Sequence, residues 1–319
     1  MATWKGNLAT PLVSILCHSY NHLNYIDDAI RGFLIQETGF PFEIILHDDA
    51  STDGTEKIIK QYQKAYPTLI KAVIQTENQY SKGRKPSLLS FSHASGQYMA
   101  FCEADDFWID SHKLQRQIDA FMQWSECRLC CHGAYRLFPD GKIKAYNSIN
   151  SANIWYINDF IENGGGAVPT ASLMMHRSVF EILPLWFEDA PVGDYFLQVL
   201  GAHAGGDKAI YIHEPMSVYR VSATGSWSNT LKPGYDEHFN KMLVYIEKLN
   251  SHLSHRYRHS FSVFQSKTLY THSRYLLQNS RFNEAFKHAV KSILKSRSIL
   301  LKKLIVLISA LFHFRLNVS

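Results

Sequence analysis

Two clusters of carboxylates lie at the ends of apolar runs, where their chemistry is easiest to use. The first is Asp48, Asp49 and Asp53, and the second is Glu103, Asp105 and Asp106. The runs that lead into them, residues 42–48 and 97–102, read as buried strands. Parallel strands that end at one edge of an open sheet bring their terminal residues together, and ligands bind at that edge. The sequence therefore predicts one polar site built from both clusters.

A calcium loop is the first alternative for "DDASTDG", and its spacing can be tested. An EF-hand loop needs a bidentate Glu at its twelfth position. Counted from Asp49, that position is Lys60, a cation where the metal needs an anion. Asp53 stands three residues before Glu56, which is capping-box spacing ahead of a helical pattern. We therefore interpret Asp53 as a helix cap, which leaves Asp48 and Asp49 at the strand end.

The elements that must position these acids alternate along the chain. Strands are expected at 11–17, 42–48, 69–75 and 97–102, with helices at 25–34, 54–66 and near 87–94. This alternation favours a parallel sheet of crossover units. A hairpin at 128–146 follows, then a Gly-rich loop, a strand and a helix within 163–180, and a last strand at 211–220. From Tyr235 the pattern is helical only. We expect a catalytic domain over residues 1–234 and a helical region over 235–319.

Composition and charge narrow the class of protein. The 319 residues are 46% hydrophobic and 19% charged, as in soluble globular chains, and five cysteines do not suggest a disulfide framework. We expect neither a signal peptide nor a membrane-spanning stretch. Residues 281–319 hold eight Lys or Arg and one acid, so this tail carries +7 and the remainder −2. That asymmetry argues against nucleic-acid binding by the main domain.

Four stretches together resemble a known family. They are "PLVSILCHSYNHLNYIDDAI", "FEIILHDDASTDGT", "GQYMAFCEADDFWIDSHKLQRQID" and "GDYFL". In this order and spacing they resemble the large inverting nucleotide-sugar glycosyltransferase family that builds bacterial surface polysaccharides, over about residues 10–225. The resemblance implies an α/β GT-A fold, Rossmann-like with a mostly parallel central sheet flanked by helices, followed here by a C-terminal helical extension. The chain looks most like the branch of this family whose acidic motif reads E-G-D-D-Y-W. In this chain Ala104 replaces the glycine of that motif and Phe107 replaces the tyrosine.

The resemblance also implies roles for particular residues. Asp105 and Asp106 would hold Mn²⁺ or Mg²⁺ against the donor's diphosphate, because hard cations take carboxylate oxygens. Asp49 would accept a hydrogen bond from the nucleotide base. The remaining nucleotide-binding residues that it implies are His18, Ser19, Tyr20 and, again, Asp105. For His18, simple packing at a strand end is an equal alternative.

A proton acceptor is needed if the sugar carbon is inverted. The resemblance assigns this role to Asp194 of "GDYFL", although Asp at a helix start is also a favoured cap. Arg177 is a candidate for contacting the phosphates or the acceptor, or else a polar residue at a strand end. Arg220 and Trp227 fall where the family's loop closes over donor and acceptor. A Trp there can stack on a sugar or pack the loop down.

The tail offers a second kind of surface. Residues 298–315 read as an apolar helix with one narrow stripe of Ser298, Lys302, Ser309 and His313. Such a helix can lie on an anionic membrane with basic residues near the headgroups, or it can be buried against the catalytic domain or in a homodimer. The basic residues expected at the headgroups are Lys291, Lys295, Arg297, Lys302, Lys303 and Arg315. We expect a cytoplasmic location, peripheral on the inner membrane face.

These observations lead to one function and one alternative. We expect a metal-dependent inverting glycosyltransferase that moves a sugar from a nucleotide-diphosphate donor, a UDP-sugar above others, to a glycan or lipid-linked acceptor in O-antigen or capsule synthesis. A kinase or oxidoreductase is disfavoured, because neither glycine-rich phosphate motif is present. A non-catalytic sugar-nucleotide-binding or scaffold protein is the alternative.

Overall fold

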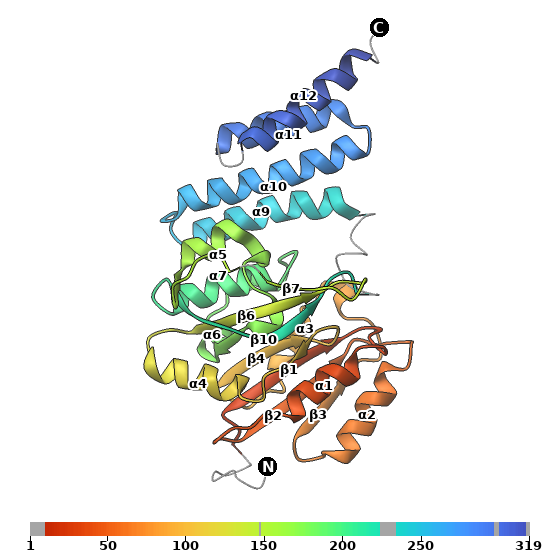
Figure 1. Ribbon diagram of the computed structural model, residues 1–319, viewed down its shortest axis with the longest axis vertical. Coiled ribbons are helices and arrows are strands. Elements are labelled where there is room, and N and C mark those ends of the chain that lie inside the picture. Colours follow the sequence, from red (N-terminus) through yellow and green to blue (C-terminus); the bar gives the residue numbers. More distant parts are fainter. Residues whose placement is uncertain (1–9, 147, 224–233, 297–299, 317–319) are drawn as a thin grey trace. The chain divides into compact units, whose positions relative to one another are not determined.

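A computed structural model describes residues 10–146, 148–223, 234–296 and 300–316, except for the side chains of residues 301 and 311–316. The chain divides into two compact units. The first comprises residues 1–160 and 165–231, and the second comprises residues 161–164 and 232–319. Trp227 lies outside the described residues. Figure 1 shows the sheet of the first unit and the helices of the second.

One ten-stranded sheet organises the first unit. Its strands are β1 (Val13–Ser19), β2 (Phe42–Asp48), β3 (Ile70–Ile74), β4 (Tyr98–Glu103), β5 (Phe107–Trp108), β6 (Leu129–Leu137), β7 (Ile143–Ala145), β8 (Ile154–Tyr156), β9 (Met174–His176) and β10 (Lys208–Arg220). The order is β3-β2-β1-β4-β9-β6-β10-β5, with β7 on β6 and β8 on β10. Strands β3, β2, β1 and β4 are all parallel, as are β6 and β10.

The helices of the first unit join these strands. They are α1 (Ile26–Leu34), α2 (Thr55–Ala65), α3 (Pro86–Phe91), α4 (Lys113–Gln123), α5 (Ile157–Asn163), α6 (Ser178–Glu181) and α7 (Asp194–Ala204). Strands β1 and β2 are buried along their whole length, because helices cover both faces of the parallel part. The alternation of strands and helices read from the sequence is confirmed, and so is the mostly parallel central sheet.

Strand β9 is the strand expected within residues 163–180, but the sequence pattern did not predict its place and direction in the sheet. It pairs antiparallel with both β4 and β6, and so it joins the two parallel halves of the sheet. Its three residues are too few to show a period, and nothing in the sequence states its direction. The hairpin of β6 and β7 is confirmed, since Tyr135–Leu137 pair antiparallel with Ile143–Ala145.

The packing around Trp108 fixes the turn that carries the second acidic cluster. Its indole ring packs edge to face on Phe33 at 4.8 Å and donates a hydrogen bond of 2.9 Å to the Ala171 carbonyl oxygen. The backbone of Trp108 also lies against Gly32, where an added Cβ would stand 2.8 Å from its carbonyl oxygen. Helix α1 therefore approaches β5 closely only because it has a glycine there.

A buried lysine lies beneath the same ring. The Lys113 ammonium stands 3.8 Å from the centre of the Trp108 ring and donates to Gln117 Oε1 at 2.7 Å. Burial lowers the pKa of Lys113 to about 7. The Gln117 amide in turn bonds the Ser172 carbonyl oxygen, 3.0 Å away. This chain of contacts ties α4 to the strand end where Asp105 and Asp106 sit.

The second unit is helical throughout its described part. It contains α9 (Tyr235–His252), α10 (Arg258–Gln278), α11 (Phe282–Lys295) and α12 (Leu300–Leu316), together with residues 161–164 at the end of α5. Helices α10 and α11 pack against each other as a helical hairpin. None of the described helices is both long and apolar enough to cross a membrane.

Helix α12 corrects one expectation about the basic tail. Lys303 is fully buried, and its ammonium donates to Ser266 Oγ at 2.6 Å and to the Ser296 carbonyl oxygen at 2.5 Å. It therefore binds the orphan carbonyls at the carboxyl end of α11, where a cation is favoured, and it is withdrawn from any headgroup. Lys302 and Ile305 remain exposed on α12.

Candidate active site

The carboxyl ends of β2, β1 and β4 lie side by side, as the sequence predicted. In the register of the sheet, Ser19 is opposite Asp48 and His18 is opposite Glu103. Both acidic clusters therefore reach the same edge, on either side of β1. The side chains there are not equivalent, because some are already paired within the fold and others are not.

Asp48 is paired and fully buried. Its Oδ1 accepts hydrogen bonds from Ser19 Oγ at 3.0 Å and Ser51 Oγ at 2.5 Å, and its Oδ2 accepts one from the Ser51 backbone N–H at 3.0 Å. These bonds hold the turn that follows β2. The acid is thus part of the frame of the site, and Ser19 is tied to it by its side chain.

Asp49 holds the loop after β3. Its two carboxylate oxygens accept the backbone N–H groups of Gln79 and Tyr80, at 2.7 and 3.0 Å. Each carboxylate oxygen has a second lone pair, so this carboxylate can still accept a bond from a nucleotide base. Asp53 accepts hydrogen bonds from the backbone N–H groups of Thr55 and Leu23, and so it supports the turn before α2. The prediction that Asp53 caps this helix is wrong, because the N-cap residue is Gly54.

His18 meets the second cluster directly. Its Nδ1 lies 3.3 Å from Glu103 Oε1, and because an ionised carboxylate only accepts, Nδ1 carries the proton. Within the described residues its Nε2 is buried without a hydrogen-bond partner. Tyr20, two residues further along the chain, is 43% exposed. The strand end thus offers one unsatisfied imidazole nitrogen and one open aromatic ring.

Asp105 and Asp106 are the uncompensated acids of the site. Burial raises the pKa of both carboxyl groups, and for Asp106 the adjacent Asp105 charge raises it further. Among the residues that the structure describes, no lysine or arginine forms an ion pair with either carboxylate. Asp106 Oδ1 accepts only the Arg220 backbone N–H, at 2.8 Å.

Arg220 clamps this turn, and its charge lowers the pKa of both carboxyl groups without outweighing the effect of burial. Its guanidinium donates to the Asp105 carbonyl oxygen at 2.8 Å and forms an ion pair with Asp28 on α1. The same group lies over the rings of Phe107, at 4.4 Å, and Tyr25, at 5.2 Å. The residue predicted to belong to the closing loop is therefore at the site, at the end of β10.

Asp194 is the first residue of α7 and is half-buried. Its Oδ1 accepts the Tyr195 backbone N–H at 2.7 Å, so it also serves the helix end. Burial raises the pKa of its carboxyl group, Glu103 raises it further, and Lys85 lowers it. A Cβ on Gly165 would lie 2.7 Å from Asp194 Oδ2, so the Gly-rich loop passes directly over the carboxylate.

Tyr146 and Lys85 belong to the site but were not predicted. Burial raises the pKa of the Tyr146 hydroxyl, the Arg136 guanidinium lowers it, and the charges of Asp194 and Asp106 both raise it. Tyr146 therefore lies within electrostatic reach of the acid pair and of the proposed base. Lys85 is buried beside Gly193. Its basic loop, between β3 and β4, was the only signal; a tyrosine after a hairpin gives none.

Arg177 is elsewhere. Its guanidinium donates to the carbonyl oxygens of Ala94 and Gly96, at 3.0 and 3.1 Å, and lies 4.6 Å from the Phe91 ring centre. These contacts are at the amino end of β4, whereas the acids follow its carboxyl end. The polar strand-end interpretation therefore holds, and Arg177 is left out of the site.

The donor set of the acid pair fits a hard divalent cation. Two adjacent carboxylates that form no ion pair with a lysine or arginine in the described ranges carry the oxygen ligands that Mg²⁺ or Mn²⁺ prefers, and a bound cation would relieve their repulsion. Within the described ranges no group of three or more His, Cys, Asp or Glu side chains converges as a metal site. A cation at Asp105 and Asp106 would thus take further ligands from phosphate and water.

The fold is of the GT-A type, and the comparisons with known proteins agree. A mannosyltransferase from Pyrobaculum calidifontis, solved with GDP-Man and Mn²⁺, matches with a TM-score of 0.53 at 17% identity, over 95% of this chain and 86% of that one. The family model described as glycosyl transferase family 2 matches residues 14–183. This chain belongs to glycosyl transferase family 2.

Two sequence relatives differ in what their names state. An uncharacterized protein of Mycobacterium tuberculosis is 33% identical over 219 residues, which are 67% of this chain and 60% of that relative. The Escherichia coli UDP-Glc:alpha-D-GlcNAc-diphosphoundecaprenol beta-1,3-glucosyltransferase WfgD is 26% identical over 222 residues, 69% of this chain and 81% of that one. This chain thus spans less than two thirds of the length of the first relative.

Proposed function

We propose that this protein is an inverting glycosyltransferase that transfers a sugar from a nucleotide-diphosphate donor to a hydroxyl group. The observation that carries the proposal is that Asp105 and Asp106 follow the carboxyl end of β4, beside the ends of β1 and β2, and that neither forms an ion pair with a lysine or arginine among the described residues. Acids that the fold leaves unpaired at the carboxyl edge of an α/β sheet are positioned for a ligand.

The donor would bind along β1, β2 and β4. Asp49 would accept a hydrogen bond from the base, and His18, Ser19 and Tyr20 would line the nucleotide pocket. Asp105 and Asp106 would hold Mn²⁺ or Mg²⁺, which when bound supplies positive charge opposite the diphosphate leaving group. The buried Lys85, beside Gly193, would add a positive charge near Asp194. The cation of the related mannosyltransferase supports this choice of metals.

Asp194 would act as the general base. The raised pKa of its carboxyl group makes Asp194 a stronger proton acceptor than an ordinary aspartate, which suits a general base. The carboxylate would remove the acceptor proton while the hydroxyl oxygen attacks the sugar carbon from the face opposite the leaving group. Inversion at that carbon follows from this single displacement.

The acceptor is proposed from the relatives. WfgD acts, by its name, on a sugar linked to diphosphoundecaprenol, so a lipid-linked glycan in surface polysaccharide synthesis is the proposed acceptor and a UDP-sugar the proposed donor. Such an acceptor would place the enzyme at the cytoplasmic face of a membrane. The exposed apolar side of α12, with Leu304, Ile305 and Ile308 beside Lys302, is the surface that we propose meets it.

The test compares nucleotides first and turnover second. A bound nucleotide raises stability by mass action, so UDP, GDP, CMP and dTDP are screened for thermal stabilisation with Mn²⁺. The sugar form of the best nucleotide is then supplied, and its Mn²⁺-dependent hydrolysis and the anomeric configuration of the transferred sugar are measured by NMR. We expect UDP to stabilise most and the configuration to invert. Binding without any hydrolysis or transfer would instead support the non-catalytic alternative.

A further inference from the structure

The second unit contains a cavity of its own, of about 510 Å³. It opens among helices α9, α10 and α11. Its apolar lining is Phe239, Leu243, Leu269 and Leu294, and its polar lining is Asn240, Gln265, His288, Lys291 and Lys295. Phe239 and Leu269 are buried, whereas Asn240, Leu294 and both lysines are exposed. The cavity thus has an apolar floor and a basic mouth.

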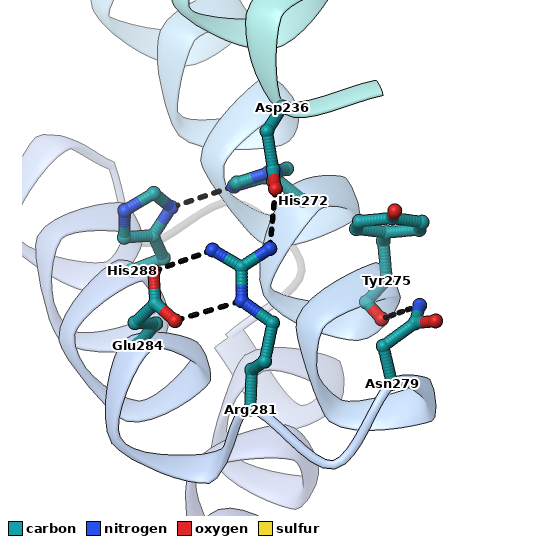
Figure 2. Close-up of polar contacts among 7 residues, drawn as sticks. All are labelled: Asp236, His272, Tyr275, Asn279, Arg281, Glu284 and His288. Atoms are coloured by element: carbon teal, nitrogen blue, oxygen red, sulfur yellow. Dashed lines mark hydrogen bonds and ion pairs between the residues drawn. The ribbon is translucent and has the colours of Figure 1, made fainter. Parts of the chain in front are cut away.

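The polar side of the floor is held in one protonation state. His272 Nε2 lies 2.7 Å from Asp236 Oδ1, and His272 Nδ1 lies 2.9 Å from His288 Nδ1 (Figure 2). Burial lowers the pKa of both imidazoles, that of His288 to about 4, so both are neutral near pH 7. Because Asp236 only accepts, His272 donates from Nε2 and accepts at Nδ1. His288 must then donate from Nδ1, which leaves its Nε2 as an acceptor in the cavity wall.

Two ion pairs and a ring contact lie behind these histidines. Asp236 also pairs with Arg281, and Arg281 bonds both carboxylate oxygens of Glu284, at 2.7 and 2.6 Å (Figure 2). The Phe239 ring stacks on the His272 ring at 3.8 Å between centres. Asp236 and Glu284 are therefore both paired with Arg281, and neither neutralises the lysines at the cavity mouth.

Gln265 places a neutral amide at the wall of the cavity. Its side chain lines the cavity and is 8% exposed, and among the described residues its amide makes no hydrogen bond. The amide therefore keeps its hydrogen-bonding capacity free at the wall of the cavity. It offers one acceptor and two donor hydrogens to an occupant.

The two lysines set the charge of that occupant. Lys291 and Lys295 stand one helical turn apart on α11, and in the described part of the chain neither forms an ion pair. The Lys291 charge lowers the pKa of His288, so it lies close to the floor. Two unpaired ammonium groups at the mouth of an apolar cavity favour an anion that carries an apolar group.

We propose that this cavity binds a lipid phosphate, a phosphate ester whose apolar chain enters between the leucines. The phosphate would lie at Lys291 and Lys295 and its ester end at Gln265. A bare sugar is a poorer fit, because three of the four apolar side chains are leucines, which give no aromatic face for stacking. This binding is separate from the transfer reaction, so its failure would leave the donor site untested and its success would not require turnover.

The probe is dihexanoyl phosphatidic acid below its critical micelle concentration, titrated into the full chain by calorimetry. Inorganic phosphate and dihexanoyl phosphatidylcholine are titrated in parallel. We expect binding of the phosphatidic acid and at least about tenfold weaker binding of the other two. Equal binding of inorganic phosphate would overturn the apolar part of the proposal, and equal binding of the phosphatidylcholine would overturn the role of the lysines.

Four variants locate the binding. The double substitution Lys291→Ala with Lys295→Ala should weaken it about tenfold or more, and Asn240→Trp should block the mouth. Gln265→Leu keeps the volume and removes the amide, so it should also weaken binding. Lys287→Ala, an exposed lysine of the same helix that does not line the cavity, is the matched control. Equal loss in the control, or none in the double variant, would refute the site; circular dichroism checks that each variant folds.

Discussion

The two units treat the same side chain in opposite ways. In the helical unit, Asp236 lies between His272 and Arg281, and its hydrogen bond with Arg281 is the main cause that lowers the pKa of its carboxyl group. In the first unit, burial raises the pKa of Asp106 and Asp194, and no arginine or lysine among the described residues pairs with either. An acid with a cationic partner stabilises the fold, whereas an acid without one is available to bind a ligand.

The difference separates residues that a sequence motif cannot separate. Asp48 and Asp49 are adjacent acids at a strand end, and so are Asp105 and Asp106. The first pair accepts hydrogen bonds from the turn and loop around it, while the second pair shares one bond with Arg220. Unsatisfied charge, more than the presence of acids, marks the part of the edge where a cation and a diphosphate belong.

The largest expected effect breaks the unpaired side of this comparison. Asp106→Asn should lower transfer by about a thousandfold or more, since the cation would lose a charged ligand, while the fold is kept. Turnover with the donor found above is the measurement, and circular dichroism reports the fold. Asp119→Asn, an exposed acid on α4 that bonds Gln115, is the matched control. Undiminished turnover in Asp106→Asn, or in excess chelator, would contradict the metal assignment.

Asp194→Asn should lower turnover about a hundredfold or more while donor binding survives, because the asparagine can still accept the Tyr195 N–H but cannot take a proton. The pH profile of the parent should lose activity on the acid side at a pH above the ordinary value of 3.8, as the raised pKa directs. If turnover stays within a few fold of the parent, Asp194 is only a helix-end residue.

Asp194→Asn should change the stability of the fold in the opposite direction from its turnover. A carboxyl group whose folded pKa is raised contributes most at low pH, and its contribution is lost as the pH rises through that pKa. Removing the charge at pH 7 should therefore raise the melting temperature of Asp194→Asn, on the order of a few degrees. Asp236→Asn should lower it. Equal signs for the two variants in calorimetry would show that the comparison between the units is wrong.

Arg281→Met tests the paired side. The lowered pKa of Asp236 adds stability above the ordinary value of 3.8, and this stability is lost as the pH falls through the folded value. The variant should thus melt at a lower temperature than the parent at pH 7, and the difference should shrink at the acid end of the range. Arg274→Met, on the exposed side of α10, should change little at either pH.

The smallest effect concerns the tail helix. The double variant Ile305→Ser with Ile308→Ser should float less with anionic liposomes at low salt than the parent does. These substitutions are preferable to deleting α12, because a deletion would uncover the groups that Lys303 binds. Val244→Ser, an exposed position on α9, is the control. Flotation that does not change in the double variant, or a parent that never floats, would favour the buried or dimeric alternative for this tail.

Much of the fold could be predicted because it depends on local pattern. The strands that end at Ser19, Asp48 and Glu103 are apolar runs, and the helices between them have a regular apolar face. The position of Asp194 at a helix start was also readable from its neighbours. The strand expected within residues 163–180 is present as β9, but its antiparallel direction was not predicted, because its pairing depends on partners from β4 and β6.

The sequence by itself determined which residue types stand at the ends of which strands, and that the chain ends in basic helices. Only the tertiary structure decided which of these charges are already paired. The Arg220 backbone N–H donates to Asp106, 114 positions away in the sequence. Arg177 donates to carbonyl oxygens at the amino end of β4, away from the acids, and Lys303 is buried. A partner's distance and the exclusion of water set the state of a charge, and both depend on residues far apart along the chain.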